Sequence, residues 1–379
     1  MTTSEFDSYF PAEYAGPRRR RRRGAARDLA ARGTDWLTGR ARGRGEQPVV
    51  PEPEFSSYYG QGVVKAVPWR HEISVYLFTG GVAGGSGLLA VGAHLAGHDA
   101  LRTSARLTAL AAAGASGVAL IADLGRPERF LNMLRTLKLT SPMSVGTWIF
   151  SGYSASAGLA AACEVDRLLG GRRGGPGLPV LGALLRPFDA VGTAGLALFS
   201  APLAAYTAVL LSDTATPVWF ESRRHLPQVF VSSAALASGG VQMVLLPTGA
   251  AGPARRLAVL GALGDLVAVH RLEQHLEHEG VLEPLHTGHP GAMMRTAKAC
   301  VLGGGLGALA AGALRGTPAG RVVSVASGLA LAAASALTRF AVVEGGQASA
   351  RDPRFTVEPQ RRRLAARRAA GQVGDSITT

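Results

Sequence analysis

The stretch ISVYLFTGGVAGGSGLLAVGAHL, Ile73–Leu95, holds no Asp, Glu, Lys or Arg and decides the fold class of this chain. An apolar run of about 20 residues is long enough to cross the hydrocarbon core of a bilayer as one α-helix. It is too long for a strand and lacks the alternation of a half-buried strand, so we expect a helix. The glycines of Gly80–Gly87 recur at four-residue spacing, which predicts close helix packing; a phosphate-binding loop would need a preceding strand.

Seven further segments resemble this stretch. The chain of 379 residues is 47% apolar and only 17% charged, and its apolar residues gather in long runs. A soluble enzyme, a collagen-like chain and a disordered chain are therefore excluded for the chain as a whole. We expect an all-α polytopic membrane protein with eight transmembrane helices: Ile73–Leu95, Leu107–Ala122, Met143–Cys163, Ala190–Leu211, Val229–Leu246, Ala254–His270, Thr296–Leu314 and Val322–Val343.

Both ends of the chain are basic, and half of the 40 Lys and Arg residues lie in them. We expect a mostly disordered N-terminal tail at 1–70, a membrane domain at 71–345 and a basic C-terminal tail at 346–379. Eight spans place both tails on one side, and the excess of basic residues favours the cytoplasm, so we expect a multi-pass protein of the cell membrane. The run Arg18–Arg23 suits either anionic lipid headgroups or a topology signal, whereas nucleic acid binding is disfavoured.

Alternating span directions collect most of the unusual polar residues at one end of the expected helices. Asp265 is charged and lies well inside its span. It is either a proton relay or a packing residue, kept neutral by burial or paired with Arg339. Tyr206 and His71 are either hydrogen-bond donors to a ligand or anchors at the membrane interface. The candidates for chemistry are His71, Glu72, Asp123, Tyr206 and Asp265.

Neither haem, an iron–sulfur cluster nor another metal site is expected in this chain. Of nine histidines, only His71 and His270 lie at one end of neighbouring spans, which is a poor basis for axial ligation. The two cysteines form no CxxC pair, so we expect no cluster. Four histidines near 280 match no strong metal-binding spacing, and we expect them in a solvated loop: His275, His278, His286 and His289.

Several blocks in the middle of the chain resemble the NrfD/PsrC family, the integral membrane subunits of polysulfide-reductase-type iron–sulfur molybdoenzymes. The resemblance runs from about His71 to Arg363, and the LGRPERF block at 124–130 is its most specific part. The blocks that carry it are YLFTGGVAGG at 76–85, ADLGRPERFLNM at 122–133, SPMSVGTW at 141–148, YTAVLLS at 206–212, Asp352-Pro353 and PQR at 359–361.

The resemblance implies eight spans in two four-helix bundles, no haem, and a quinone site near the face that docks an iron–sulfur subunit. By motif, the quinone-binding residues fall on His71, with Glu72 beside it, and on Tyr206. The family's Tyr-Thr-Gly is Tyr206-Thr207-Ala208 here, and relatives vary at the start of the first span. Arg126 and Arg129 are then expected to face the docked partner.

Quinone chemistry agrees with these residues, because a flat apolar ring needs an apolar site with a few convergent donors. Turnover moves two electrons and two protons, for which Asp123, Asp265 and Glu72 are the expected proton carriers. We therefore expect a membrane anchor that exchanges electrons between menaquinone or ubiquinone and a ferredoxin-like iron–sulfur subunit with a molybdenum- or tungsten-pterin catalytic subunit. The alternatives are a subunit that also translocates protons, a secondary transporter, and a purely structural anchor.

Overall fold

The computed structural model describes residues 62–124, 130–171, 177–178 and 180–371. The chain divides into two units, Met1–Gly62 and Val63–Thr379. The described helices all belong to the second unit.

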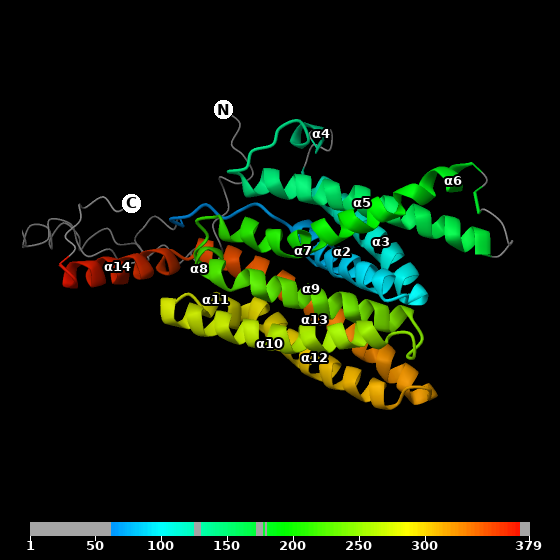
Figure 1. The fold of residues 1–379 in the computed structure, drawn as a ribbon. Helices are drawn as coiled ribbons and strands as arrows, with labels where there is room; N and C mark the ends of the chain where they lie inside the picture. Colours follow the sequence, from blue (N-terminus) through cyan, green and yellow to red (C-terminus); the bar gives the residue numbers. More distant parts are fainter. Residues whose placement is uncertain (1–61, 125–129, 172–176, 179, 372–379) are drawn as a thin grey trace, which may run out of the picture. The chain divides into compact units, whose positions relative to one another are not determined.

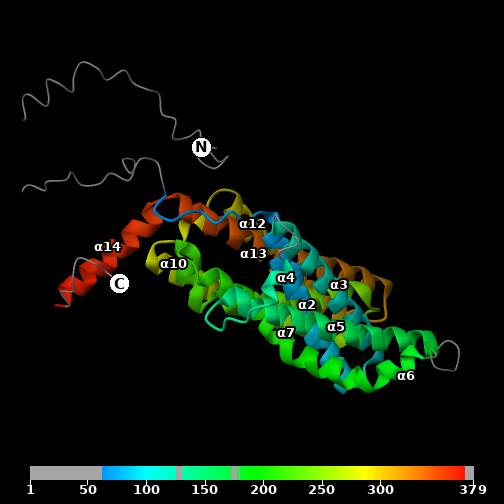
Figure 2. The ribbon, with the colours of Figure 1, turned by 90° about the horizontal axis from the view of Figure 1, so that it is seen from above.

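The described residues form helices and no strand, so the predicted all-α class is confirmed. The described residues contain eight long helices, joined by short helical segments that include α8 (Pro217–Glu221) and η5 (Ser222–Arg224). The long helices lie alongside one another (Figures 1 and 2). A further helix, α14 (Arg354–Ala369), follows the last long one. The long helices are α2 (His71–Leu95), α3 (Asp99–Asp123), α5 (Pro142–Gly171), α7 (Asp189–Ser212), α9 (Leu226–Leu245), α10 (Gly252–Glu279), α12 (Gly288–Ala313) and α13 (Pro318–Arg351).

Each predicted span lies largely within one of these long helices. Six helices among the described residues are long and apolar enough to cross a membrane: α2, α3, α7, α9, α12 and α13. The chain is therefore a multi-pass membrane protein, whereas the count of eight spans stays a prediction. Serines and glycines lower the apolarity of α5, and Arg255, Arg256 and Asp265 lower that of α10.

The glycine-rich stretch of α2 allows its backbone to approach two neighbouring helices. A Cβ atom on Gly84 would lie 2.8 Å from the carbonyl oxygen of Ser200 in α7. A Cβ atom on Gly85 would lie 2.8 Å from the carbonyl oxygen of Ala234 in α9. The predicted packing role of these glycines is therefore confirmed.

Helix contacts fall into two sets that meet at α2. In the first set, α2 and α5 each pack on both α3 and α7. In the second set, α9 and α12 each pack on both α10 and α13, and α9 also lies against α2 and α7. Close backbone contacts recur in the second set, where a Cβ atom on Gly240 would lie 2.7 Å from the carbonyl oxygen of Gly328.

Several helices extend beyond the predicted spans because helix formation does not stop where apolar residues stop. Helix α3 begins at Asp99 rather than Leu107. Helix α10 continues to Glu279 and ends at Gly280, whose φ of 74° is the left-handed conformation that glycine adopts readily. The prediction that His275, His278, His286 and His289 lie in a loop was wrong. His275 and His278 lie in α10, His286 ends the short helix α11 (Glu283–His286), and His289 lies in α12. Helix α13 runs past the predicted domain end at 345.

The segment before α2 is fastened to the second half of the chain. The rings of Trp69 and Trp219 stack with centroids 5.4 Å apart. The Trp219 indole donates to the Val342 carbonyl oxygen at 2.7 Å, and the Gln347 side chain donates to the Trp69 carbonyl oxygen at 2.6 Å. The start of α2 is thereby tied to α8 and α13.

Candidate functional site

His71 is the first residue of α2, and its side chain is exposed. Its ring lies 6.1 Å from the ring of Phe340 in α13, with the two planes 26° apart. The histidine therefore sits at the entrance to the helices, beside the second set, and not in the interior.

Glu72 and Asp123 place two half-buried carboxyl groups at the same end of neighbouring helices. Glu72 lies in the first turn of α2, and Asp123 ends α3. Asp123 interacts electrostatically with both Glu72 and Arg70. The Glu72 Oε2 atom is buried without a hydrogen-bond partner. Such an oxygen can accept a hydrogen bond from a donor, so this pair of carboxyl groups offers an unsatisfied acceptor near the start of α2.

Tyr206 is half-buried in α7 and belongs to the contact between α7 and α5. Its ring lies directly over Gly146, where any Cβ atom would clash with the ring. Within the described part of the chain, the phenol has no hydrogen-bond partner. Among the described residues, Tyr206 forms no hydrogen bond or ring contact with His71 or Glu72.

The packing of α2 on α7 explains this separation. Gly84 lies against Ser200 and Ala204, and Gly87 lies against Ser200, so the two helices run antiparallel. Tyr206 follows Ala204 by half a turn and is therefore level with about Gly81. At 1.5 Å per residue, the level of Gly81 is about 15 Å from His71 along α2. One quinone ring is much smaller than this, so the structure does not bring the two predicted ligands together.

Asp265 and Arg339 are buried charges in α10 and α13, at 3% and 0% exposure. They interact electrostatically, but no ion pair within 4.0 Å joins them in the described chain. Arg339 instead donates to the Phe230 carbonyl oxygen at 2.7 Å, and its guanidinium lies 3.6 Å from the centre of the Phe230 ring. Asp265 Oδ1 and the Nε and Nη1 atoms of Arg339 are buried without partners.

The Arg339 guanidinium reaches the same depth as Tyr206. A Cβ atom on Gly81 would lie 3.3 Å from Arg339 Nη2. Tyr206 is level with Gly81 on the α7 side of α2, and Arg339 with Asp265 lies on the side of the second helix set. Tyr206 and Arg339 therefore lie at one level, about two to three helical turns from His71 along α2. Asp265 interacts electrostatically with Arg339 there.

Two predicted residues, Arg126 and Arg129, lie outside the described residues. The block that contains them joins α3 to α4 (Phe130–Met133), beyond the end of α3 that carries Asp123.

A charged network at the opposite end of the first helix set was missed by the sequence analysis. Arg106 is fully buried and lies 2.6 Å from Asp189 and 3.2 Å from Glu164. Arg102 donates to both oxygens of Glu164 at 3.0 Å. Arg167 donates to Asp189 at 2.6 Å. These residues border the predicted spans rather than interrupt them, so hydropathy alone placed them in loops.

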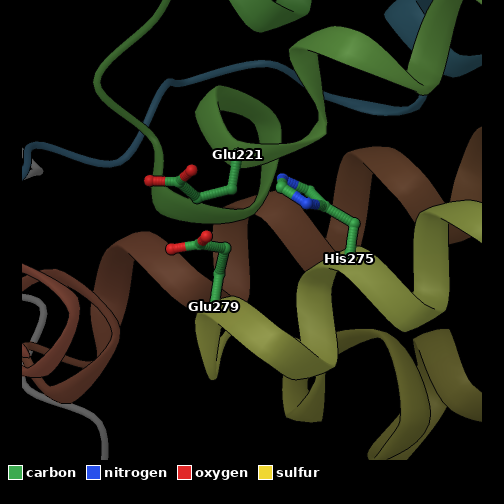
Figure 3. A group of neighbouring side chains, drawn as sticks. All are labelled: Glu221, His275 and Glu279. Carbon is green, nitrogen blue, oxygen red and sulfur yellow. The ribbon is translucent and has the colours of Figure 1, made fainter.

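A second missed cluster joins α10 to the connection between α7 and α9. Figure 3 shows the side chains of Glu221, His275 and Glu279 turned toward one another. Their ligand atoms all lie within 4.8 Å of one another. Among the described residues, this is the one group of three or more such side chains that could hold a metal ion. His286 and His289 are instead bound to Glu273 at 3.0 Å and Glu344 at 2.7 Å.

His225 borders this cluster, with its ring centre 5.1 Å from that of His275. Burial lowers the pKa of His225, and the neighbouring His275, Arg271 and Arg224 lower it further. The imidazole is therefore biased toward its neutral form.

Comparison with known proteins identifies the family. The model of the polysulphide reductase NrfD family matches residues 61–271, more than half of the chain. No curated protein matches the chain. The chain belongs to the NrfD family, as its sequence blocks predict.

Proposed function

We propose that this NrfD-family chain is the quinone-reactive membrane subunit of a molybdopterin and iron–sulfur oxidoreductase. It has eight spans in two four-helix bundles, α2, α3, α5, α7 and α9, α10, α12, α13. It resides in the cell membrane with both termini in the cytoplasm. Its partners are a ferredoxin-like iron–sulfur subunit and a molybdenum- or tungsten-pterin subunit, which dock at the end that carries His71 and bind Arg126 and Arg129.

The common depth of Tyr206 and Arg339, which interacts electrostatically with Asp265, is the observation that carries this proposal. A phenol without a partner in the described chain can donate to a quinone carbonyl oxygen, and the surrounding helix interior is apolar, as a quinone ring requires. Buried ionisable groups inside a membrane protein are costly and by default mark a functional pathway. Asp265 and Arg339 retain unpartnered atoms, which leaves them able to bind a proton or a water molecule.

The depth of Tyr206 refines the roles of the remaining residues. Tyr206 donates to menaquinone or ubiquinone inside the membrane. Glu72, Asp123 and His71 lie nearer the helix ends and carry protons between the site and water. In the oxidising direction, a quinol gives two electrons to the iron–sulfur partner and two protons to these groups; the reducing direction is the reverse. The chain itself then needs neither haem nor an iron–sulfur cluster.

The test is quinone-dependent turnover of the whole complex, measured beside turnover with a soluble dye. Tyr206→Phe removes the hydroxyl group and keeps the aromatic ring over Gly146, so the helix packing is retained. One neutral hydrogen bond contributes roughly 0.5–1.5 kcal/mol. This corresponds to about a 2- to 12-fold loss of quinone affinity, with dye turnover unchanged.

His71→Ala is the companion variant, and we expect a smaller effect because His71 is exposed and distant from Tyr206. Wild-type quinone turnover in both variants would contradict the proposal. If the complex still assembles, that result would favour the alternative of a purely structural anchor. If the purified chain moves a solute without any redox partner, it would favour a secondary transporter.

A further inference from the structure

Glu221, His275 and Glu279 converge in the second unit from two separate parts of the chain. Glu221 ends α8, whereas His275 and Glu279 lie one helical turn apart on α10. The Glu221 side chain is only 6% exposed. Figure 3 shows the two carboxyl groups and the imidazole directed into one space, and their ligand atoms lie within 4.8 Å of one another.

This donor set has a clear chemical preference. One imidazole nitrogen and two carboxylate oxygens suit a zinc-class divalent ion, which binds three protein ligands and leaves a further position open. The spacing of His275 and Glu279 puts both on one helix face, so a single ion can contact both. Mg²⁺ and Ca²⁺ prefer oxygen ligands alone and fit the imidazole poorly.

There is room for an ion and its water beside these ligands. A cavity of about 230 Å³ is bordered by all three residues and by three arginines: Arg223, Arg224 and Arg363. His225 adds a further nitrogen donor next to His275, and its Nδ1 atom is buried without a partner.

Two arginines already lie at these carboxylates: Arg223 is 3.6 Å from Glu221, and Arg363 reaches both glutamates. Arg363 of α14 is 2.6 Å from Glu221 and 4.0 Å from Glu279. Its side chain is 47% exposed, so it can leave toward water without being buried elsewhere. A metal ion and the Arg363 guanidinium would compete for the same oxygens.

We infer that Glu221, His275 and Glu279 form a zinc-class divalent-cation site whose occupation displaces Arg363 and releases that part of α14. The site lies outside the proposed quinone pathway, and the inference does not depend on the proposed function.

Zn²⁺ titration of the purified full-length protein in detergent, against a chromophoric chelator, tests the ligands. Removing a residue that merely supports a metal ligand typically costs roughly 10- to 100-fold in affinity, so loss of a ligand should cost at least as much. We expect this loss in Glu221→Gln and in His275→Ala. His278→Ala and Glu277→Gln are matched controls, because both residues are exposed on the same turns of α10 and should leave the affinity unchanged.

Arg363→Gln tests the competition. An exposed ion pair contributes about 0.2–1 kcal/mol, so removing this competitor should tighten Zn²⁺ binding up to roughly 5-fold. Arg367→Gln, on the same helix, is the control and should leave the affinity unchanged. Limited proteolysis within α14 should become faster on adding Zn²⁺ to the wild type and stay the same in His275→Ala.

Three results would overturn the inference. Equal Zn²⁺ affinity in the wild type, Glu221→Gln and His275→Ala would assign the ion to surface histidines. Failure of both the wild type and Arg363→Gln to bind Zn²⁺, with helix content by circular dichroism unchanged, would exclude the site. Competition by Mg²⁺ as effective as that by Zn²⁺ would refute the ligand chemistry.

Discussion

Two buried sets of charges in this protein differ in how completely they are paired. In the network of Arg106, Glu164 and Asp189, each carboxylate oxygen is bound by an arginine or a hydroxyl group. Asp265 and Arg339 are equally buried but lie beyond ion-pair distance and keep unpartnered atoms. Pairing of both carboxylates fixes these side chains and suits a structural role, although Arg106 Nε is also buried without a partner. An unpaired carboxyl group such as that of Asp265 is able to exchange a proton. Buried charged residues are thus expected to be structural in the first helix set and functional in the second.

The largest expected effect follows from breaking the paired network. Arg106→Ala leaves the buried Glu164 and Asp189 carboxylates partly uncompensated, which should destabilise the protein by about 3–5 kcal/mol. Thermal unfolding in detergent, with the exposed Arg315→Ala as the control, measures this. An unfolding midpoint equal to that of the control would contradict a structural role for the network.

A change in the incompletely paired set should separate activity from stability. Asp265→Asn keeps the shape of the side chain and removes its ability to carry a proton, so quinone turnover should fall by roughly 100-fold or more. The loss of stability should be smaller than in Arg106→Ala, because Asp265 Oδ1 has no hydrogen bond to lose. A stability loss as large as that of Arg106→Ala, with normal turnover of the folded fraction, would assign Asp265 a structural role and contradict its role in proton transfer.

Glu72 should give the smallest effect. Its unpartnered Oε2 atom places it with the incompletely paired groups, but it lies near the helix end and is only half-buried. Glu72→Gln should change stability by less than about 1 kcal/mol, because no hydrogen bond to Oε2 is lost. The pH profile of the quinone-dependent rate should shift, since one titrating group is removed. An unaltered profile would exclude Glu72 from the proton route.

The helical fold was predictable because apolar runs record burial in lipid directly. Asp265 was also visible, as a charge inside such a run. Arg106 was not, because it stands at the edge of its run and hydropathy cannot distinguish a solvated charge from one buried among neighbouring helices. The separation of His71 from Tyr206 was hidden for another reason: sequence gives positions along each helix, but the register between helices depends on contacts such as Gly84 against Ala204.

The cluster of Glu221, His275 and Glu279 was also invisible in the sequence. His275 and Glu279 alone form an ordinary surface pair, and Glu221 joins them only through the path of the chain between α7 and α9. Because His275 was predicted to lie in a loop, its helical spacing from Glu279 gave no sign that the two side chains share one helix face. The extension of α10 to Glu279 restores this pairing.

The attachment of Trp69 bears on the order in which the protein is made. Trp69 precedes the first long helix, yet it is held by Trp219 and by Gln347 of the last one. During synthesis from the N-terminus, the residues before α2 leave the ribosome long before α13 exists. Helix α2 can therefore enter the membrane early, but Trp69 meets Trp219 only after α8 has been made, and Gln347 only after most of α13 has been made. A nascent chain halted before Gln347 would hold Trp69 through Trp219 alone and would lack the hydrogen bond from α13 to the residues before α2.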